Sequence, residues 1–389
     1  MMMRTFADQT HSRLARHYLG VLRRCTARFD RGGDHTINAL QEFDREWQQI
    51  DFTWTWALER YRHMRHAARL CCAFALAGGE LFNLRLLGHD RIKRFRAGIS
   101  AARLLSDQKS LCIHVGQLGV VLREIGQFDR ALRCFRYQLM LARSLHKRKA
   151  ECQAIGNVGV IQKNLGHYDE AVHCYRIQLA LARKIRDQVS IGKALGNLGV
   201  VLKHKGQYRE ARRVYAQRLA LARSLHDYRA QANASMNMGL VDFHEQQYDS
   251  ALKLYRRALR LFRTIADRLG EARCLANMGN CLRAQNDFEQ ASTVLIEALD
   301  RLERIGERLE QGLCMLAELN IAKGNSAEAM GYAARALELA RRANDPRVEG
   351  ESLWLIARLQ WALGKQHEAR QSAAAALNTL DHNRRETFC

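Results

Sequence analysis

The sequence predicts an all-α fold, a right-handed solenoid of about seven to eight stacked helical hairpins that follow an N-terminal helical cap. Three observations predict it. The 389 residues contain a single proline, Pro346, as expected of long helices joined by short links. Helix-forming residues dominate, and β-branched runs are scarce. Small and aromatic residues recur at intervals of 40 residues, as in a repeat protein.

Several registers carry the repeat. One is a glycine column at Gly119, Gly159, Gly199, Gly239 and Gly279. An aromatic column and an alanine column follow it, represented in the second copy by Tyr168 and Ala171, and a further aromatic column includes Tyr175. We expect the glycines to let the two helices of each hairpin approach closely. Each hairpin would still leave one apolar face uncovered, so neighbouring hairpins must stack on it.

The repeat divides the chain into five segments. We expect residues 1–66 to form a helical cap and residues 67–108 a degenerate first hairpin. Residues 109–305 hold five regular 40-residue hairpins, and residues 306–381 hold two divergent ones, the first with a two-residue deletion. Residues 382–389 form a tail.

The order of small residue, turn glycine, aromatic and alanine resembles the tetratricopeptide repeat family. The segments GNVGVIQKNLGHYDEA and GNLGVVLKHKGQYREA are similar to the long repeats of the Leu-Gly-Asn protein (Pins) and of kinesin light chain. In the cap, EFDREWQQIDFTWTWALE resembles the stretch that leads into the repeats of bacterial STAND-type signalling ATPases. Their ATPase is not implied, because no GxxxxGK[ST] loop occurs. A plain pair of capping helices is the alternative interpretation.

The composition favours negatively charged partners. The net charge is +22, from 62 Lys and Arg against 40 Asp and Glu, which suits nucleic acid or acidic peptides; a solvated surface with dispersed arginines is the alternative. Eleven cysteines without a CxxC pair indicate buried thiols in a reducing compartment. Neither a secretory signal nor an apolar run of 18 residues is found, so we expect a cytoplasmic protein without membrane insertion.

The sequence contains no arrangement typical of an enzyme. It has no Ser/His/Asp or Cys/His constellation, no HExxH motif and no phosphate-binding glycine loop. Cysteines and histidines are not clustered at the spacing of a zinc site. We therefore expect no catalytic activity, no cofactor and no metal.

A column of carboxamides lies two residues before the glycine column, at Gln117, Asn157, Asn197, Asn237 and Asn277. Asparagine is a mediocre helix former, so its recurrence in mid-helix requires a reason. The resemblance to tetratricopeptide repeats implies that this register faces a concave groove, where an asparagine ladder holds an extended ligand. The alternative is that the asparagines hydrogen-bond between neighbouring helices and fix the stacking angle.

Two further registers complete the predicted peptide-binding groove. Four residues before the column, one helical turn away on the same face, stand Gln153, Lys193, Asn233 and Arg273. Seven residues after it stand Asn164, His204 and His244. We expect a non-catalytic adaptor or scaffold whose groove binds an extended, acidic peptide segment.

Two other functions remain open. The basic surface could bind nucleic acid along an arginine column, Arg103, Arg143, Arg183, Arg223 and Arg263, at the ends of the second helices. The structural interpretation of that column is that each arginine complements the helix dipole. The third function is a sensor or regulatory subunit of a prokaryotic signalling or defence complex whose effector is on another chain.

Overall fold

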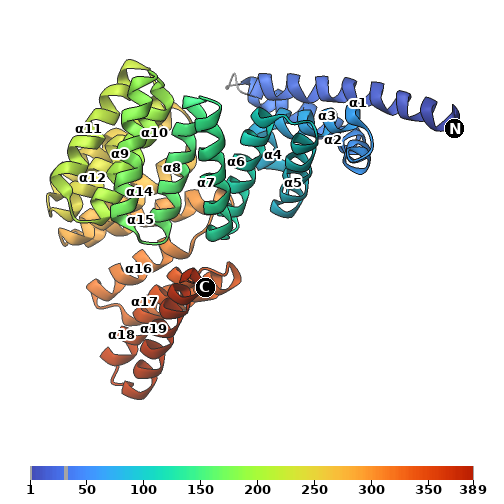
Figure 1. Ribbon diagram of the computed structural model, residues 1–389. Coiled ribbons are helices and arrows are strands. Elements are labelled where there is room, and N and C mark those ends of the chain that lie inside the picture. The colour runs from blue at the N-terminus through green and yellow to red at the C-terminus, as the bar shows by residue number, and fades with distance from the viewer. Residues whose placement is uncertain (1, 30–33, 389) are drawn as a thin grey trace. The chain divides into compact units, whose positions relative to one another are not determined.

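The computed structural model describes residues 2–29 and 34–388. This part of the chain forms nineteen α-helices and no strand, which confirms the all-α solenoid (Figure 1). It divides into two compact units, Met1–Ala194 and Leu195–Cys389, here called the first and second units. The boundary falls within helix α10 (Gln188–His204), and each unit is described by itself.

The first unit begins with two long helices, α1 (Met2–Phe29) and α2 (Asp34–Arg60), which pack on each other and on α3 (Arg65–Ala77). Trp54 of α2 is fully buried and stacks on Phe74 of α3 at 5.8 Å and on Phe82 at 5.0 Å. The pair thus covers an apolar face of α3. The predicted degenerate hairpin, residues 67–108, contains α3, the short α4 (Gly79–Arg85) and α5 (Gly88–Leu104).

The regular hairpins consist of helices of equal length, 17 residues each. In the first unit they are α6 (Gln108–Glu124), α7 (Phe128–Ser144), α8 (Arg148–Asn164) and α9 (Tyr168–Lys184). In the second unit they are α11 (Tyr208–Ser224), α12 (Tyr228–His244), α13 (Tyr248–Thr264), α14 (Arg268–Ala284) and α15 (Phe288–Arg304). Within each unit successive helices pack side by side, and first helices also contact the next first helix, as α6 does α8 and α12 does α14.

The glycine column has the predicted role. A Cβ atom at Gly159 would lie 2.8 Å from Cε1 of Tyr175, and one at Gly239 would lie 2.7 Å from Cε1 of Tyr255. Both rings are completely buried. The absent side chain therefore makes room for an aromatic ring of the second helix, which fills the interior of the hairpin.

Left-handed residues end the helices at the turns. Gly166 has φ of 79°, and the register continues with Gln246 at 59° and Asn286 at 63°, where glycine is replaced. The first helix of a hairpin is usually capped by an aspartate: the side chains of Asp107, Asp187, Asp227 and Asp267 each accept a hydrogen bond from the backbone N–H three residues later.

The second unit ends with two divergent hairpins, formed by α16 (Glu310–Lys323), α17 (Ser326–Arg342), α18 (Pro346–Ala362) and α19 (Gln366–Phe388). Helix α16 has 14 residues, and residues 307–309 before it are not helical. The tail predicted for 382–389 lies in the last turns of α19, apart from Cys389, which lies outside the described residues. In the part of the chain that the structure describes, no helix is long and apolar enough to cross a membrane.

Candidate functional site

The carboxamide column lies at the solvent boundary of the first helices. Asn157 of α8, Asn197 of α10, Asn237 of α12 and Asn277 of α14 are each partly exposed, as is Gln117 of α6. In each unit we call the surface that these residues form on the first helices the carboxamide face of that unit. Its members in the first unit are Gln117 and Asn157, and its members in the second unit are Asn197, Asn237 and Asn277.

The four asparagines make no hydrogen bond within the described residues, either to a neighbouring helix or to their own. Each carboxamide carries two N–H donors and an oxygen acceptor. These groups are therefore satisfied by water in the free protein and are available to a ligand.

The residues four positions before the carboxamide column are more exposed than the column itself. Gln153, Lys193 and Arg273 are exposed, and Asn233 is partly exposed. Among the described residues, neither Lys193 nor Arg273 has an ion-pair partner. Their charges are open to solvent beside the carboxamide face.

The third predicted register lies at the end of the first helices. Asn164, His204 and His244 are the last residues of α8, α10 and α12 and are exposed. His244 stacks on Tyr208 with ring centroids 5.6 Å apart. Partial burial, together with nearby Lys203, lowers the pKa of His244, so the ring is neutral at pH 7. In this register His244 is therefore an uncharged ring that stacks on Tyr208.

A row of cations was missed by the sequence interpretation. It lies six residues after the carboxamide column and comprises Arg123, Lys163, Lys203 and Arg283, interrupted by Phe243. Arg283 is 3.0 Å from Glu318, whereas Lys163 and Lys203 have no carboxylate partner among the described residues. Burial lowers the pKa of both lysines. The recurrence at 40 residues was visible, but the partial burial of these ammonium groups was not.

Polar side chains of the second helices lie directly behind the carboxamide face. Gln178 of α9 packs against Gly156, which precedes Asn157, and Gln138 of α7 packs against Gly116 in the same way. Both glutamines are buried, and their Oε1 atoms accept no hydrogen bond from any described residue. In the second unit Arg218 of α11 takes this place against Gly196, and burial lowers its pKa.

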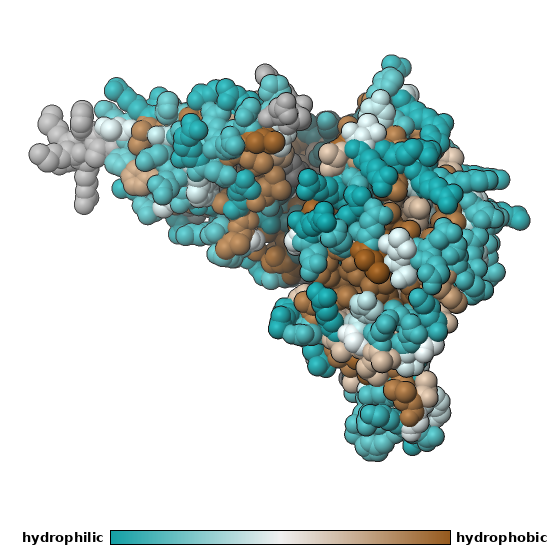
Figure 2. Space-filling model, turned by 180° about the vertical axis from the view of Figure 1, so that it is seen from behind, coloured by the Kyte–Doolittle hydropathy of each residue, from teal (hydrophilic) through white to brown (hydrophobic). Residues whose placement is uncertain are grey.

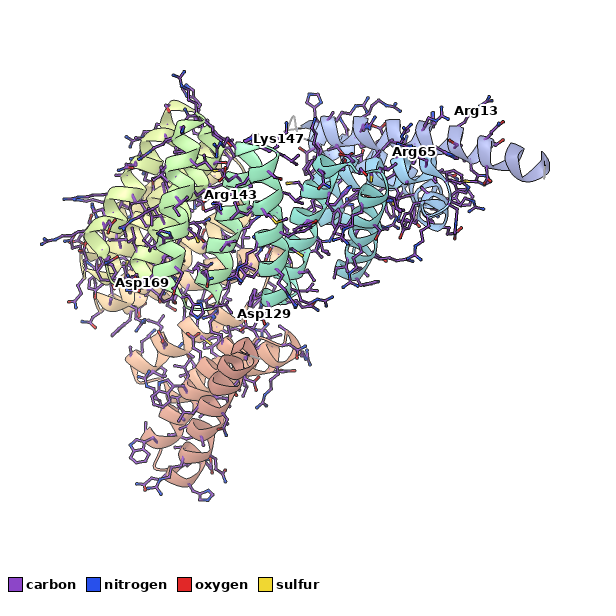
Figure 3. The ribbon with its side chains drawn as sticks, in the orientation of Figure 1. Arg13, Arg65, Asp129, Arg143, Lys147 and Asp169 are labelled. Atoms are coloured by element: carbon purple, nitrogen blue, oxygen red, sulfur yellow. The ribbon has the colours of Figure 1, made fainter. Side chains whose placement is uncertain are left out.

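The arginine column at the ends of the second helices takes part in contacts between hairpins. Arg143 lies 3.0 Å from Glu151, eight residues later (Figure 3). Arg263 likewise faces the buried Glu271 at 3.7 Å. The carboxylates belong to the following helix, so these arginines join neighbouring hairpins. The recurrence of arginine at Arg143 and Arg263 is thus explained by a specific ion pair with the next helix.

A strongly basic, open cavity of about 600 Å³ lies in the first unit, lined in part by Arg62, Lys93, Arg96 and Arg130. No carboxylate is among its lining residues. His89 and Gln127 add two further nitrogen-bearing side chains to the lining. This is a second surface, separate from the predicted groove residues, that suits an anion.

In the described residues no group of three or more His, Cys, Asp and Glu side chains could hold a metal ion. The ten cysteines of that part of the chain are free thiols. Burial raises the pKa of all ten, for example that of Cys71 to about 12, so these thiols are protonated at pH 7.

Residues 150–224 and 230–304 match the family model described as tetratricopeptide repeat. These residues are tetratricopeptide repeats. The match confirms the resemblance predicted from the glycine, aromatic and alanine columns. No curated protein sequence is significantly similar to the chain.

Several solved tetratricopeptide-type structures share the fold. The quorum sensor NprR from B. thuringiensis, in its apo form, is 14% identical, with a TM-score of 0.63, over 89% of this chain and 97% of that one. A Rap protein complexed with Competence and Sporulation Factor is 11% identical, with a TM-score of 0.59, over 97% and 99% of the two chains.

A third similar structure is a signal transduction ATPase with numerous domains (STAND) from Pyrococcus horikoshii, which has a tetratricopeptide repeat sensor. It is 14% identical, with a TM-score of 0.56, over 92% of this chain and 55% of that one. At such identities these likenesses describe the fold.

Proposed function

We propose that this protein is a non-catalytic adaptor or regulator that binds an extended, acidic peptide segment along the carboxamide face. The observation that carries the proposal is that Asn157, Asn197, Asn237 and Asn277 share one register, reach solvent and make no hydrogen bond to any residue that the structure describes. An extended backbone presents alternating N–H and C=O groups, and a carboxamide can pair with both.

The acidic character of the segment is inferred from the surrounding charges. Lys193 and Arg273 are exposed, and Lys163 and Lys203 are partly buried; none of the four pairs with a carboxylate in the described part of the chain. A cation that has lost part of its hydration and has no counter-ion is stabilised when an anion approaches. Glutamate or aspartate side chains of the ligand would supply that charge.

The regulatory part of the proposal draws on proteins of similar fold. One is named a quorum sensor, one is complexed with Competence and Sporulation Factor, and one carries its repeats as the sensor of a signal transduction ATPase. We propose by analogy that ligand binding here is read out by a partner chain, as in a signalling or defence complex whose effector is on another chain. We also propose the cytoplasm as its compartment, because the described cysteines are free thiols.

The test is selection of binders from a displayed library of random 12-residue peptides, followed by measurement of Kd by fluorescence polarisation. We expect selected peptides to be rich in Asp and Glu. Replacing Asn197→Ala and Asn237→Ala together should weaken binding at least tenfold, because each lost hydrogen bond contributes about 0.5–1.5 kcal/mol.

The matched control is Asn38→Ala/Asn378→Ala, which removes two carboxamides from exposed positions of α2 and α19 outside the repeat register. This control should bind like the wild type. Binders that tolerate the Asn197/Asn237 change as well as they tolerate the control would contradict the proposal.

Nucleic-acid binding is a second candidate, favoured by the basic cavity of the first unit, where four cationic side chains gather without a carboxylate. It requires a steep fall in affinity for a single-stranded oligonucleotide between 50 mM and 200 mM salt. The double variant Arg96→Ala/Arg130→Ala should reduce that slope, whereas Asn197→Ala/Asn237→Ala should leave it unchanged. No binding at 50 mM salt rules this candidate out.

A further inference from the structure

A cavity of about 480 Å³ lies in the second unit, where the last regular hairpin, α14–α15, meets the divergent helix α16. Its apolar lining includes Met236, Leu240, Leu269, Leu295, Leu299 and Met315. Figure 2 shows hydrophobic surface next to the C-terminal hairpins. Its volume is within the range of about 300–1,000 Å³ that is usual for ligand sites. We call it the α14–α16 cavity.

The first cause of the cavity is a change of side chains between the two helices of a hairpin. In three hairpins a long side chain of the second helix packs against a glycine of the first helix. These side chains are Gln138, Gln178 and Arg218. In the last regular hairpin the same register pairs Ala276 with Ala298, and both line the cavity. Two methyl groups cannot fill the space that a long side chain occupies elsewhere.

The second cause is the late start of α16. This helix has 14 residues where the regular helices have 17, so the turn that would close the gap is missing. The start of α16 is nevertheless held close to α15, because a Cβ atom at Gly312 would lie 2.7 Å from Cδ2 of Leu299. Both α15 and the start of α16 thus bound the cavity.

The rim connects the cavity with the predicted groove. Arg273 and Asn277, both members of the predicted site, line it. Six charged residues line the cavity in all: Arg273, Arg308 and Arg347 against Glu307, Glu310 and Asp345, which sum to zero. Arg308 contacts Glu310 at 2.9 Å and Asp345 at 2.7 Å, so much of this charge is neutralised within the protein.

We propose that the α14–α16 cavity binds one large apolar side chain of the extended segment, while Asn277 pairs with the backbone of the ligand beside it. This inference rests on the proposed function. An apolar space of this size costs stability when it is unfilled, and two separate departures from the repeat create it. The apolar lining disfavours a charged side chain inside the cavity, and Met236 and Met315 can adapt to different apolar shapes.

The experiment uses the full chain and the peptides selected above. Ala276→Leu and Ala298→Leu fill the cavity from α14 and from α15, respectively. For a peptide with a Leu, Met, Phe or Trp anchor, each should raise Kd at least tenfold. Replacing the anchor with Ala should weaken binding to the wild type by a similar factor and should abolish the difference between the wild type and the filled variants. Ala220→Leu, at an exposed position of α11, is the control and should bind normally.

Thermal unfolding separates cavity filling from misfolding. We expect the Tm of at least one filled variant to equal or exceed that of the wild type, and the effect of the anchor replacement on binding to the wild type does not depend on how the variants fold. Filled variants that bind as tightly as the wild type, while Asn197→Ala/Asn237→Ala weakens binding, would overturn the cavity proposal and leave the proposed function intact. Selected peptides that ignore the asparagines would overturn both.

Discussion

Asn237 illustrates how a residue that is unfavourable for the helix can still recur in it. A mid-helix asparagine lowers helix stability relative to alanine by about 0.5–0.7 kcal/mol. Asn237 makes no hydrogen bond within the described residues that would offset this cost. The side chain therefore gives the free protein no stabilising hydrogen bond to a described residue. Its carboxamide remains available to hydrogen-bond with a ligand.

The first prediction follows from this balance. Asn157→Ala and Asn237→Ala should each raise the free energy of unfolding by about 0.5 kcal/mol, because helix propensity improves and no hydrogen bond is lost. Urea unfolding followed by circular dichroism measures the change. A loss of 1 kcal/mol or more would mean that the carboxamide fixes the stacking of neighbouring helices, as the alternative interpretation states.

A second prediction concerns His114 of α6, which is completely buried. Burial lowers its pKa to about 4, although Gln117 and Asp107 act in the opposite direction. The unfolded chain binds a proton near pH 6.5 and the native chain does not, so stability falls as the pH drops from 6.5 towards 4.

Between pH 7 and pH 5 this residue should cost the native state roughly 2 kcal/mol. The variant His114→Leu removes the titration and should lose that much less stability over the same interval in urea unfolding. Equal losses for the two proteins would show that His114 does not resist protonation.

At this scale the sequence predicted the register of the candidate site but not its full membership. Asn157 and its equivalents were found because they recur in one column. Lys163 and Lys203 recur as well, but a lysine on a helix is ordinarily solvated, and Phe243 interrupts their column. Only the packing of side chains around them shows that they are partly buried and lack a carboxylate.

At the scale of the helix, the caps follow the repeat with one exception. Lys147 stands where Asp107, Asp187, Asp227 and Asp267 cap the other first helices (Figure 3). Its side chain makes no cap hydrogen bond to α8. The N-terminal N–H groups of α8 are thus less well satisfied than those of its neighbours.

Lys147→Asp should therefore raise the free energy of unfolding by about 1 kcal/mol, through a cap hydrogen bond and a favourable charge at the helix N-terminus. Lys147→Ala, which removes the charge without supplying an acceptor, is the control and should give no such gain. Thermal unfolding of both variants measures the difference, and an equal gain in both would exclude capping as its cause.

Helix lengths were largely predictable from the 40-residue period, because the small and aromatic columns fix where each helix must contact the next. The two-residue deletion of the sixth hairpin was also visible. Its consequence was not, since a deletion can shorten either helix or the turn. The structure shows a 14-residue α16. The cavity beside it therefore could not be foreseen.

At the scale of the molecule, each unit is an array in which helices contact near neighbours along the chain. Stability in such arrays is a sum of local hairpin terms and neighbour interfaces. A defect should therefore remain local. Tyr255 of α13 is completely buried against Gly239, so its replacement introduces such a defect.

Tyr255→Ala should destabilise its surroundings by about 3–5 kcal/mol, as large-to-small aromatic changes in cores do. Hydrogen exchange measured by mass spectrometry should show faster exchange in α12, α13 and α14, with α6 and α7 unchanged. A uniform increase over both units would indicate instead that the chain unfolds in one cooperative step.

The contact of Gly116 with Gln138, and of Gly156 with Gln178, joins the two helices of a single hairpin. Such a matched pair is inherited together when a hairpin is duplicated or exchanged as a block of 40 residues. The two helices of the new copy therefore still pack on each other. Recombination at the turn inside a hairpin would instead set a glutamine against a methionine or leave a glycine facing an alanine. Crossovers between hairpins are thus the ones that the fold tolerates, for evolution and for the construction of chimaeras alike.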